Sequence, residues 1–279
     1  NPVEKERFVA PVRQKTIQKP QQEVGYIPFQ YVEKAVSYNS SFIRFLCGLF
    51  DRYSQSSPTI VRIMEDYALG ATKDGCIIYW QIDINGKVRT GKIMKYNQET
   101  GHRVKDAGGI NWVHSVLKKK KLLPDNFNLV QCLFGEHLLK MYPEKPVALV
   151  ESEKSALIAS GVYPEYIWLA TGGKSQLSIE KMKVLHGRTV LAFPDVDGFD
   201  YWKDKAKELE SIGCNVLVSD ILEKNATDQD RTNKIDLADW LIRDLMTDCR
   251  PAPNTLDTLL GINPVLKSLI ETFDLKLIA

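Results

Sequence analysis

The sequence predicts an α/β protein whose C-terminal half is a four-stranded parallel sheet with flanking helices, preceded by a smaller unit of helices and a β-hairpin. Three observations support this prediction. The composition is that of a globular protein, with 44% hydrophobic and 26% charged residues. From Pro146 onwards, short apolar runs alternate with helical patterns. Upstream, Asn85-Gly86 separates two runs rich in β-branched and aromatic residues, a strong hairpin signal.

The first 145 residues divide into three predicted parts. Residues 1–26 are polar and interrupted by prolines, which predicts a linker or arm. Residues 27–70 place apolar side chains at helical spacing, as in "YVEKAVSYNSSFIRFLCGLFDRY", and predict a small helical unit. Residues 71–145 predict a basic α+β unit built around the hairpin "GCIIYWQIDINGKVRTGKIMKYN".

Residues 146–250 carry the regular alternation. The runs "VALV", "YIWLA", "TVLAF" and "NVLVS" predict four strands, each followed by a segment of helical pattern. Strands that are apolar along their whole length are typical of a parallel sheet covered on both faces. Beyond them, residues 251–279 predict a tail with one short apolar helix, "NPVLKSLIETF".

Charge is distributed unevenly along the chain, although the total is only +2. Residues 87–121 hold ten Lys and Arg against two acids, whereas residues 195–248 hold fourteen acids against seven bases. This pattern favours a polyanion-binding surface beside a metal-binding one. The run of lysines at 118–121 is open to two interpretations, a solvated face or part of a nucleic-acid footprint.

The remaining bulk properties narrow the class of protein. The five cysteines form no CxxC pair, which argues against a zinc site or a disulfide framework and favours a cytoplasmic location. No apolar run approaches the roughly 20 residues needed to span a bilayer, so no membrane partner is expected.

Carboxylates follow the predicted strands of the parallel sheet. Glu151 ends the first strand, Asp195 and Asp197 follow the third, and Asp236 and Asp239 begin the last helix. The carboxyl ends of parallel strands meet at one edge of a sheet, so we expect these groups to converge there. Carboxylates in such a group are typical ligands of Mg²⁺. Asp236 has an alternative role, since it could simply cap the helix that it begins.

The order of these motifs resembles the toprim domain. It runs strand-Glu, strand-Thr-Gly-Gly, strand-Asp-x-Asp and then Lys-x-Asp-x-x-Asp. The resemblance implies that Glu151 is a catalytic acid/base or metal-proximal residue and that Asp195 and Asp197 bind Mg²⁺ or Mn²⁺. With help from Asp236 and Asp239, these residues are expected to hold one or two such ions. The chain departs from the family in having Ser152 where glycine usually follows the glutamate.

The segment before the parallel sheet resembles the corresponding segment of bacterial-type primases. The shared pattern is a strand, an Asn-Gly or Asp-Gly turn, a basic residue and then Lys-Tyr. It implies that Arg89, Lys92, Lys95 and Tyr96 bind nucleic acid or nucleotide, and the toprim turn implies the same for Gly172, Gly173 and Lys174. The "TGGKS" run is not a nucleotide-hydrolysing P-loop, because Trp168 stands where that motif requires its first glycine.

These resemblances predict a primase-like toprim protein of a mobile element, one that makes primers by metal-dependent nucleotidyl transfer. The implied partners are single-stranded DNA and nucleoside triphosphates, with a replicative helicase as a further candidate. Two other hypotheses stay open at this point. The same carboxylates would serve a toprim nuclease, and the Ser152 departure keeps open a catalytically silent DNA-binding accessory.

Overall fold

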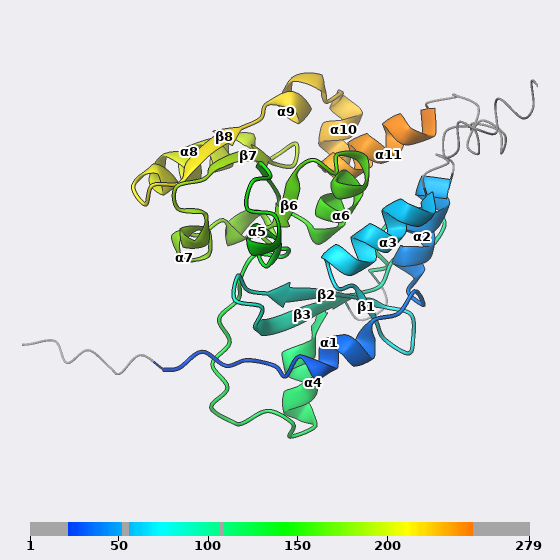
Figure 1. Ribbon diagram of the computed structural model, residues 1–279. Helices are drawn as coiled ribbons and strands as arrows, with labels where there is room; N and C mark the ends of the chain where they lie inside the picture. Colours follow the sequence, from blue (N-terminus) through cyan, green and yellow to red (C-terminus); the bar gives the residue numbers. More distant parts are fainter. Residues whose placement is uncertain (1–21, 52–55, 106–108, 248–279) are drawn as a thin grey trace, which may run out of the picture.

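The computed structural model of the protein describes residues 22–51, 56–105 and 109–247, and it contains two four-stranded sheets (Figure 1). The first sheet is antiparallel with the strand order β1-β2-β3-β4. The elements of this part are α1 Gln30–Ala35, α2 Ser41–Asp51, α3 Ser56–Asp66, β1 Gly70–Ala71, β2 Ile77–Ile82, β3 Val88–Met94, β4 Asn111–Trp112, α4 Val113–Lys119 and α5 Leu138–Met141.

The second sheet is wholly parallel with the strand order β6-β5-β7-β8. Its elements are β5 Val147–Val150, α6 Glu153–Val162, β6 Ile167–Ala170, η1 Lys174–Gln176, α7 Ile179–Met182, η2 Lys183–Leu185, β7 Thr189–Phe193, α8 Phe199–Glu210, β8 Asn215–Val218, α9 Ile221–Asn225, α10 Asp228–Asn233 and α11 Leu237–Thr247. The predicted α/β class, with a parallel sheet after a helical and hairpin unit, is therefore confirmed.

The hairpin between β2 and β3 forms because its turn residues satisfy the backbone locally. Gly86 adopts a positive φ of 76°, which an L side chain rarely adopts. The Asp83 carboxylate accepts hydrogen bonds from the backbone N–H groups of Asn85 and Lys87, both at 3.0 Å. The turn then sets the antiparallel register in which Trp80 faces Gly91.

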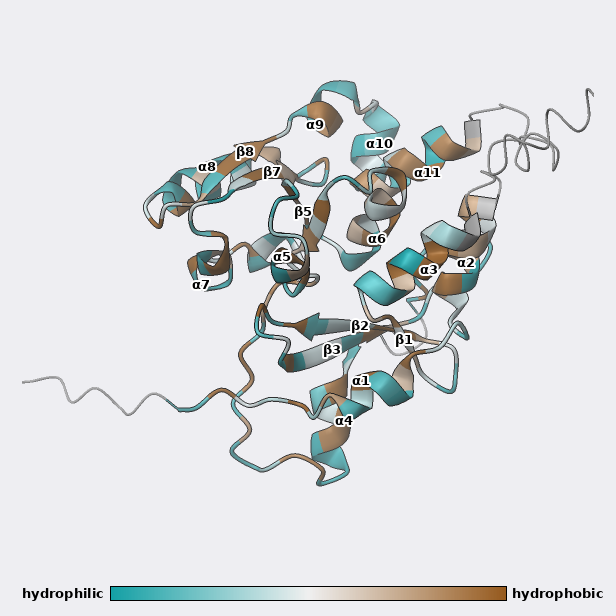
Figure 2. Ribbon diagram, viewed as in Figure 1, coloured by the Kyte–Doolittle hydropathy of each residue, from teal (hydrophilic) through white to brown (hydrophobic). Residues whose placement is uncertain are grey.

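The parallel strands are buried because both faces of their sheet are covered. Every residue of β5 and β6 is buried, and these strands occupy adjacent positions in the sheet. In Figure 2 the strands of this sheet include brown, apolar residues, whereas the ribbons of α3 and α10 include teal, hydrophilic ones. Strands that are apolar along their whole length are typical of a sheet covered on both faces.

One core joins the two parts of the chain. The largest cluster of buried side chains includes residues from α2, α3, β2 and all four parallel strands. The Tyr67 hydroxyl donates to the carbonyl of Trp168 at 2.9 Å, and Arg62 donates to the carbonyl of Ser160 at 2.7 Å. Phe134 and Ala170 form a further bridge. These contacts place α3 beside α6 (Figure 1).

The ends of the chain lie mostly beyond these elements. Most of the arm expected over residues 1–26, and all of the helical tail expected over 251–279, fall outside the described residues. Among the helices of the described part, none is long and apolar enough to cross a membrane.

Candidate active site

Glu151 lies where β5 passes into α6, and local sequence explains this turn. The buried strand Val147–Val150 ends directly before it. Ser152 has extended backbone angles and caps α6, since its hydroxyl accepts a hydrogen bond from Ser155 N at 3.1 Å. The serine that replaces the usual glycine therefore has a structural role. Glu151 itself is only 4% exposed, at the carboxyl edge of the sheet.

The Glu151 carboxylate contacts the loop that follows β7. Asp195 N donates a hydrogen bond to Glu151 Oε1 at 3.3 Å. Gly198, at the start of α8, leaves the space that this carboxylate fills, because a Cβ at that position would lie 2.6 Å from Glu151 Oε1. The sequence analysis did not single out Gly198. The available signal was its position directly after the Asp-x-Asp pair.

The convergence of carboxylates changes their acidity. Burial raises the pKa of Glu151 to about 7, and the nearby charge of Asp197 adds to the effect. Burial, followed by the charges of Glu151 and Asp236, raises the pKa of Asp195 to about 9. None of the described residues donates a hydrogen bond to the Asp195 carboxyl. The structure thus brings Glu151, Asp195 and Asp236 together, as expected from the strand ends.

Asp197 lies on the more exposed side of this group. Its side chain is 45% exposed and lies 3.5 Å from Lys174 Nζ and 3.3 Å from Lys234 Nζ. Although burial acts in the opposite direction, hydrogen bonds and charge from Lys234 and Lys174 hold the pKa of Asp197 below its ordinary value. Lys174 also donates to the carbonyl of Asp197. The predicted Lys174 is therefore at the carboxylate edge, and Lys234 is an addition from the structure.

Asp236 and Asp239 form a reciprocal cap at the start of α11. Asp239 N donates to Asp236 Oδ1 at 2.8 Å, and Asp236 N donates to Asp239 Oδ2 at 3.3 Å. Their other oxygens bind Lys154 Nζ of α6, at 3.1 Å for Asp236 Oδ2 and 2.7 Å for Asp239 Oδ1. The capping role considered for Asp236 is confirmed. Lys154 was not singled out from the sequence.

The Thr-Gly-Gly turn follows β6 and faces a lysine from the antiparallel sheet. Gly172 and Gly173 have φ values of 91° and 147°, which favour glycine. Lys92 of β3 reaches this turn, with Nζ 2.9 Å from Glu153 Oε2 and 3.4 Å from the carbonyl of Gly172. Lys92 and Glu153 are both buried. Lys92 therefore joins β3 of the antiparallel sheet to α6 by an ion pair.

The other residues expected to bind nucleic acid do not form a single patch. Arg89 Nε pairs with Asp83 at 2.8 Å, near the hairpin turn. Lys95 is partly exposed at the end of β3. Tyr96 is 5% exposed and its ring packs 4.5 Å from that of Phe42, so its binding of nucleic acid or nucleotide stays a prediction. The Phe42 ring covers the face of the Tyr96 ring on which a base would stack.

The donor set around Asp195 fits a divalent cation. No group of three or more Asp, Glu, His or Cys side chains within the described ranges is already arranged to enclose a metal ion. Burial and the charge of Glu151 nevertheless raise the pKa of Asp195, burial and the charge of Asp197 raise the pKa of Glu151, and a bound cation would offset this repulsion. Glu151, Asp195 and Asp197 are therefore the residues that fit Mg²⁺ or Mn²⁺ here.

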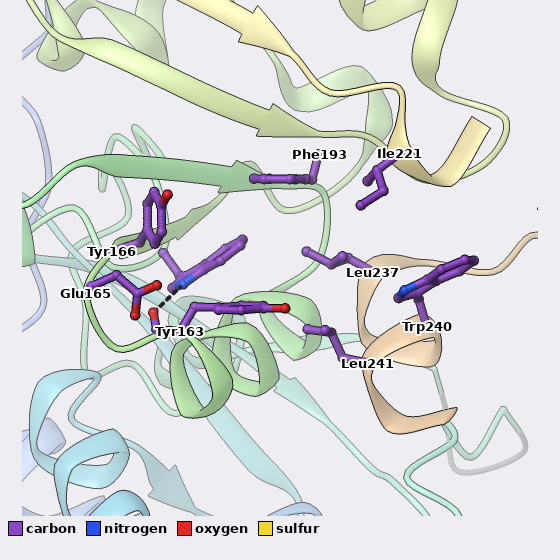
Figure 3. Close-up of a pocket in the computed structure, with 9 residues that line it drawn as sticks. Tyr163, Glu165, Tyr166, Phe193, Ile221, Leu237, Trp240 and Leu241 are labelled. Atoms are coloured by element: carbon purple, nitrogen blue, oxygen red, sulfur yellow. Dashed lines mark hydrogen bonds between the residues drawn. The ribbon is translucent and has the colours of Figure 1, made fainter. Parts of the chain in front are cut away.

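An aromatic cavity of about 240 Å³ adjoins the acidic edge. Phe193 of β7 lies two residues before Asp195, and Leu237 of α11 directly follows Asp236. Figure 3 shows these two residues with Tyr163, Tyr166, Ile221, Trp240 and Leu241 around the cavity. Among the described residues that line it, Glu165 is charged and none is a lysine or arginine. The lining does not offer a phosphate site.

The chain resembles several solved structures in fold and matches one protein family. The chain is structurally similar to the zinc-binding and RNA polymerase domains of the Aquifex aeolicus primase, with 15% identity, a TM-score of 0.41, and coverage of 82% of this chain and 65% of that one. The RNA polymerase domain of Mycobacterium tuberculosis primase DnaG matches at 10% identity and a TM-score of 0.41, covering 88% and 94%. The primase fragment of the bacteriophage T7 primase-helicase matches with 15% identity and a TM-score of 0.39. The match covers 80% of this chain and 82% of that one.

These are likenesses of fold to primase catalytic domains, at 10–15% identity. No curated protein matches the sequence. Residues 40–196 match the family described as Domain of unknown function (DUF6371). The chain belongs to this family, whose matched segment includes Glu151 and Asp195.

Proposed function

We propose that this protein is a primase-like enzyme that carries out metal-dependent nucleotidyl transfer on single-stranded DNA. The observation that carries the proposal is the hydrogen bond from Asp195 N to the Glu151 carboxylate, which joins two acidic residues that follow different strands and whose pKa values are raised to about 9 and about 7. Perturbed groups that gather at the carboxyl edge of a parallel sheet are typical of a catalytic site. The motif order shared with toprim domains supports the same conclusion.

Each carboxylate has a distinct role in this proposal. Asp195, Asp197 and Glu151 would hold Mg²⁺ or Mn²⁺, which supplies charge stabilisation for the reacting phosphate and for the attacking and leaving oxygens. In the alternative arrangement, in which Glu151 is not itself a ligand of the ion, its pKa of about 7 suits it to accept the proton of an incoming hydroxyl. Asp236 and Asp239 would support the site from α11, since their oxygens are already bonded within the chain.

The basic side chains around this edge would bind the polyanionic substrates. Lys174 is 40% exposed and lies beside the Gly172-Gly173 turn, where it can reach a phosphate. Lys95 is partly exposed at the end of β3, and the neighbouring Arg103 and Lys105 are exposed. Such lysines and arginines neutralise backbone phosphates without reading base sequence. A nucleoside triphosphate and a template strand are therefore the proposed ligands.

One gel tests the proposal. The protein is incubated with single-stranded DNA, labelled ribonucleotides and Mg²⁺ or Mn²⁺, beside the Asp195→Asn/Asp197→Asn double variant. Asp200→Asn/Asp204→Asn is the matched control, because it neutralises two exposed acids of α8. Labelled oligonucleotides from the wild type and the control, lost in the first variant, are the expected result.

Other products would replace the proposal with a different function. A shortened template that depends on Asp195 and Asp197 would identify a metal-dependent nuclease. DNA binding that survives the double substitution, without either product, would identify a non-catalytic accessory of replication. The absence of oligonucleotide synthesis in both cases would overturn the polymerising role.

A further inference from the structure

Lys154 is the only lysine or arginine, among the described residues, whose side chain bridges Asp236 and Asp239. Its Nζ lies 3.1 Å from Asp236 Oδ2 and 2.7 Å from Asp239 Oδ1, and its side chain is 11% exposed. The other two oxygens accept the backbone N–H groups of the reciprocal cap. All four carboxylate oxygens of this pair therefore already accept a hydrogen bond from within the chain.

Asp195 presents the opposite situation. Its carboxyl receives no hydrogen bond from the described part of the chain. The hydrogen bond between this residue and Glu151 is donated by the backbone, from Asp195 N to Glu151 Oε1 at 3.3 Å. A cation entering this edge meets free oxygens at Asp195 and oxygens already bonded at Asp236 and Asp239. To bind the second pair it would first have to displace a buried ammonium group.

The charges around the site support a single divalent ion. Five carboxylates gather here, those of Glu151, Asp195, Asp197, Asp236 and Asp239. Three lysines contact them directly, Lys154, Lys174 and Lys234. With every group ionised, two negative charges are left over, which one Mg²⁺ or Mn²⁺ neutralises.

We propose that the Lys154 ammonium occupies the place between Asp236 and Asp239 that a second metal ion would otherwise take, so that this site binds one divalent cation. The proposal rests on the proposed function only for the identity of the ion at Glu151, Asp195 and Asp197. Lys154 is a positioning residue, since it acts through the two aspartates and touches no reacting atom.

The test is the number of Mn²⁺ ions bound, measured by titration with the electron paramagnetic resonance signal of free Mn²⁺ as the readout. The full chain is compared with Asp239→Asn, Lys154→Met and Lys154→Met/Asp239→Asn. Lys207→Met is the matched control, because Lys207 forms an exposed pair with Asp204 on α8. Circular dichroism verifies that each variant is folded.

The expected result is one bound Mn²⁺ in the wild type, in Lys207→Met and in Asp239→Asn. Lys154→Met gains a second ion, which the additional Asp239→Asn substitution removes. A lysine that only ties α6 to α11 would change stability and leave the number of ions at one in every variant, and that outcome overturns the proposal. Should Lys154→Met fail to fold, Asp239→Asn decides: the loss of an ion from a wild-type total of two also overturns it.

The readout separates this inference from the proposed function. One ion in the wild type and two in Lys154→Met, without oligonucleotide synthesis, would refute the polymerising role and leave the role of Lys154 intact. Two ions with synthesis would refute the role of Lys154 alone. No binding of Mn²⁺ to either the wild type or Lys154→Met would refute both.

Discussion

Asp195→Asn should make the metal-free protein more stable at neutral pH, even though it removes a proposed metal ligand. In the folded chain the pKa of Asp195 is raised from its ordinary value of 3.8 to about 9. A group with a raised folded-state pKa favours folding fully while the unfolded chain is also protonated, below pH 3.8. That contribution is lost as the pH rises towards 9. Asparagine is neutral at every pH, so the Asp195→Asn variant does not lose this stability as the pH rises.

The size of the effect follows from the same shift. At pH 7 the raised pKa of Asp195 lowers the free energy of unfolding by at most about 4 kcal/mol. This figure comes from roughly 3 pKa units between the ordinary value and pH 7, at about 1.4 kcal/mol each. Asp195 is not fully buried, and solvent screens part of the repulsion. We therefore expect Asp195→Asn to raise the free energy of unfolding by about 2 kcal/mol. For a domain of this size that corresponds to a Tm increase of about 4–8 °C.

The assay is thermal unfolding in the presence of a chelator at pH 4, 7 and 8.5, with Asp200→Asn as an exposed control. The difference between Asp195→Asn and wild type should be small at pH 4 and grow with pH. Adding Mn²⁺ should raise the Tm of the wild type and not that of the variant, since only a bound ligand stabilises the folded state. A variant that is less stable than wild type by the same amount at every pH would refute this reasoning.

Two further predictions concern residues that support the site. Lys92→Met should lower the free energy of unfolding, measured by urea titration, by about 3 kcal/mol, because it leaves Glu153 buried without its cation. Adding Glu153→Gln should recover part of this loss. An unchanged urea midpoint in Lys92→Met would contradict the prediction. Gly198→Ala should abolish primer synthesis, since the new methyl group would lie 2.6 Å from Glu151 Oε1. Gly48→Ala, where nothing lies within 4 Å of the added Cβ, should retain it, and equal activities would show that the space beside Glu151 is unimportant.

Part of the candidate site follows from short-range pattern. Glu151, Asp195 and Asp236 each stand beside a predicted element of a parallel array, and such arrays bring their carboxyl ends to one edge. The structure places these three close enough that Asp236 raises the pKa of Glu151, and Glu151 and Asp236 raise that of Asp195. Tyr96 could not be assigned in the same way. Its packing against Phe42 joins residues 54 positions apart, and no local period reports such a contact.

By itself, the sequence determined the order of the strands and helices, the Asn-Gly hairpin and the acidic carboxyl edge of the parallel sheet. These features depend on alternation and turn chemistry over a few residues. Only the tertiary structure decided which charged side chains pair with one another. Lys92 crosses from β3 to pair with Glu153, and Lys154 crosses from α6 to Asp239, contacts that span 61 and 85 residues. Buried charges are paired by whichever group the packed chain brings near, and that depends on how the elements dock rather than on the residues beside them in sequence.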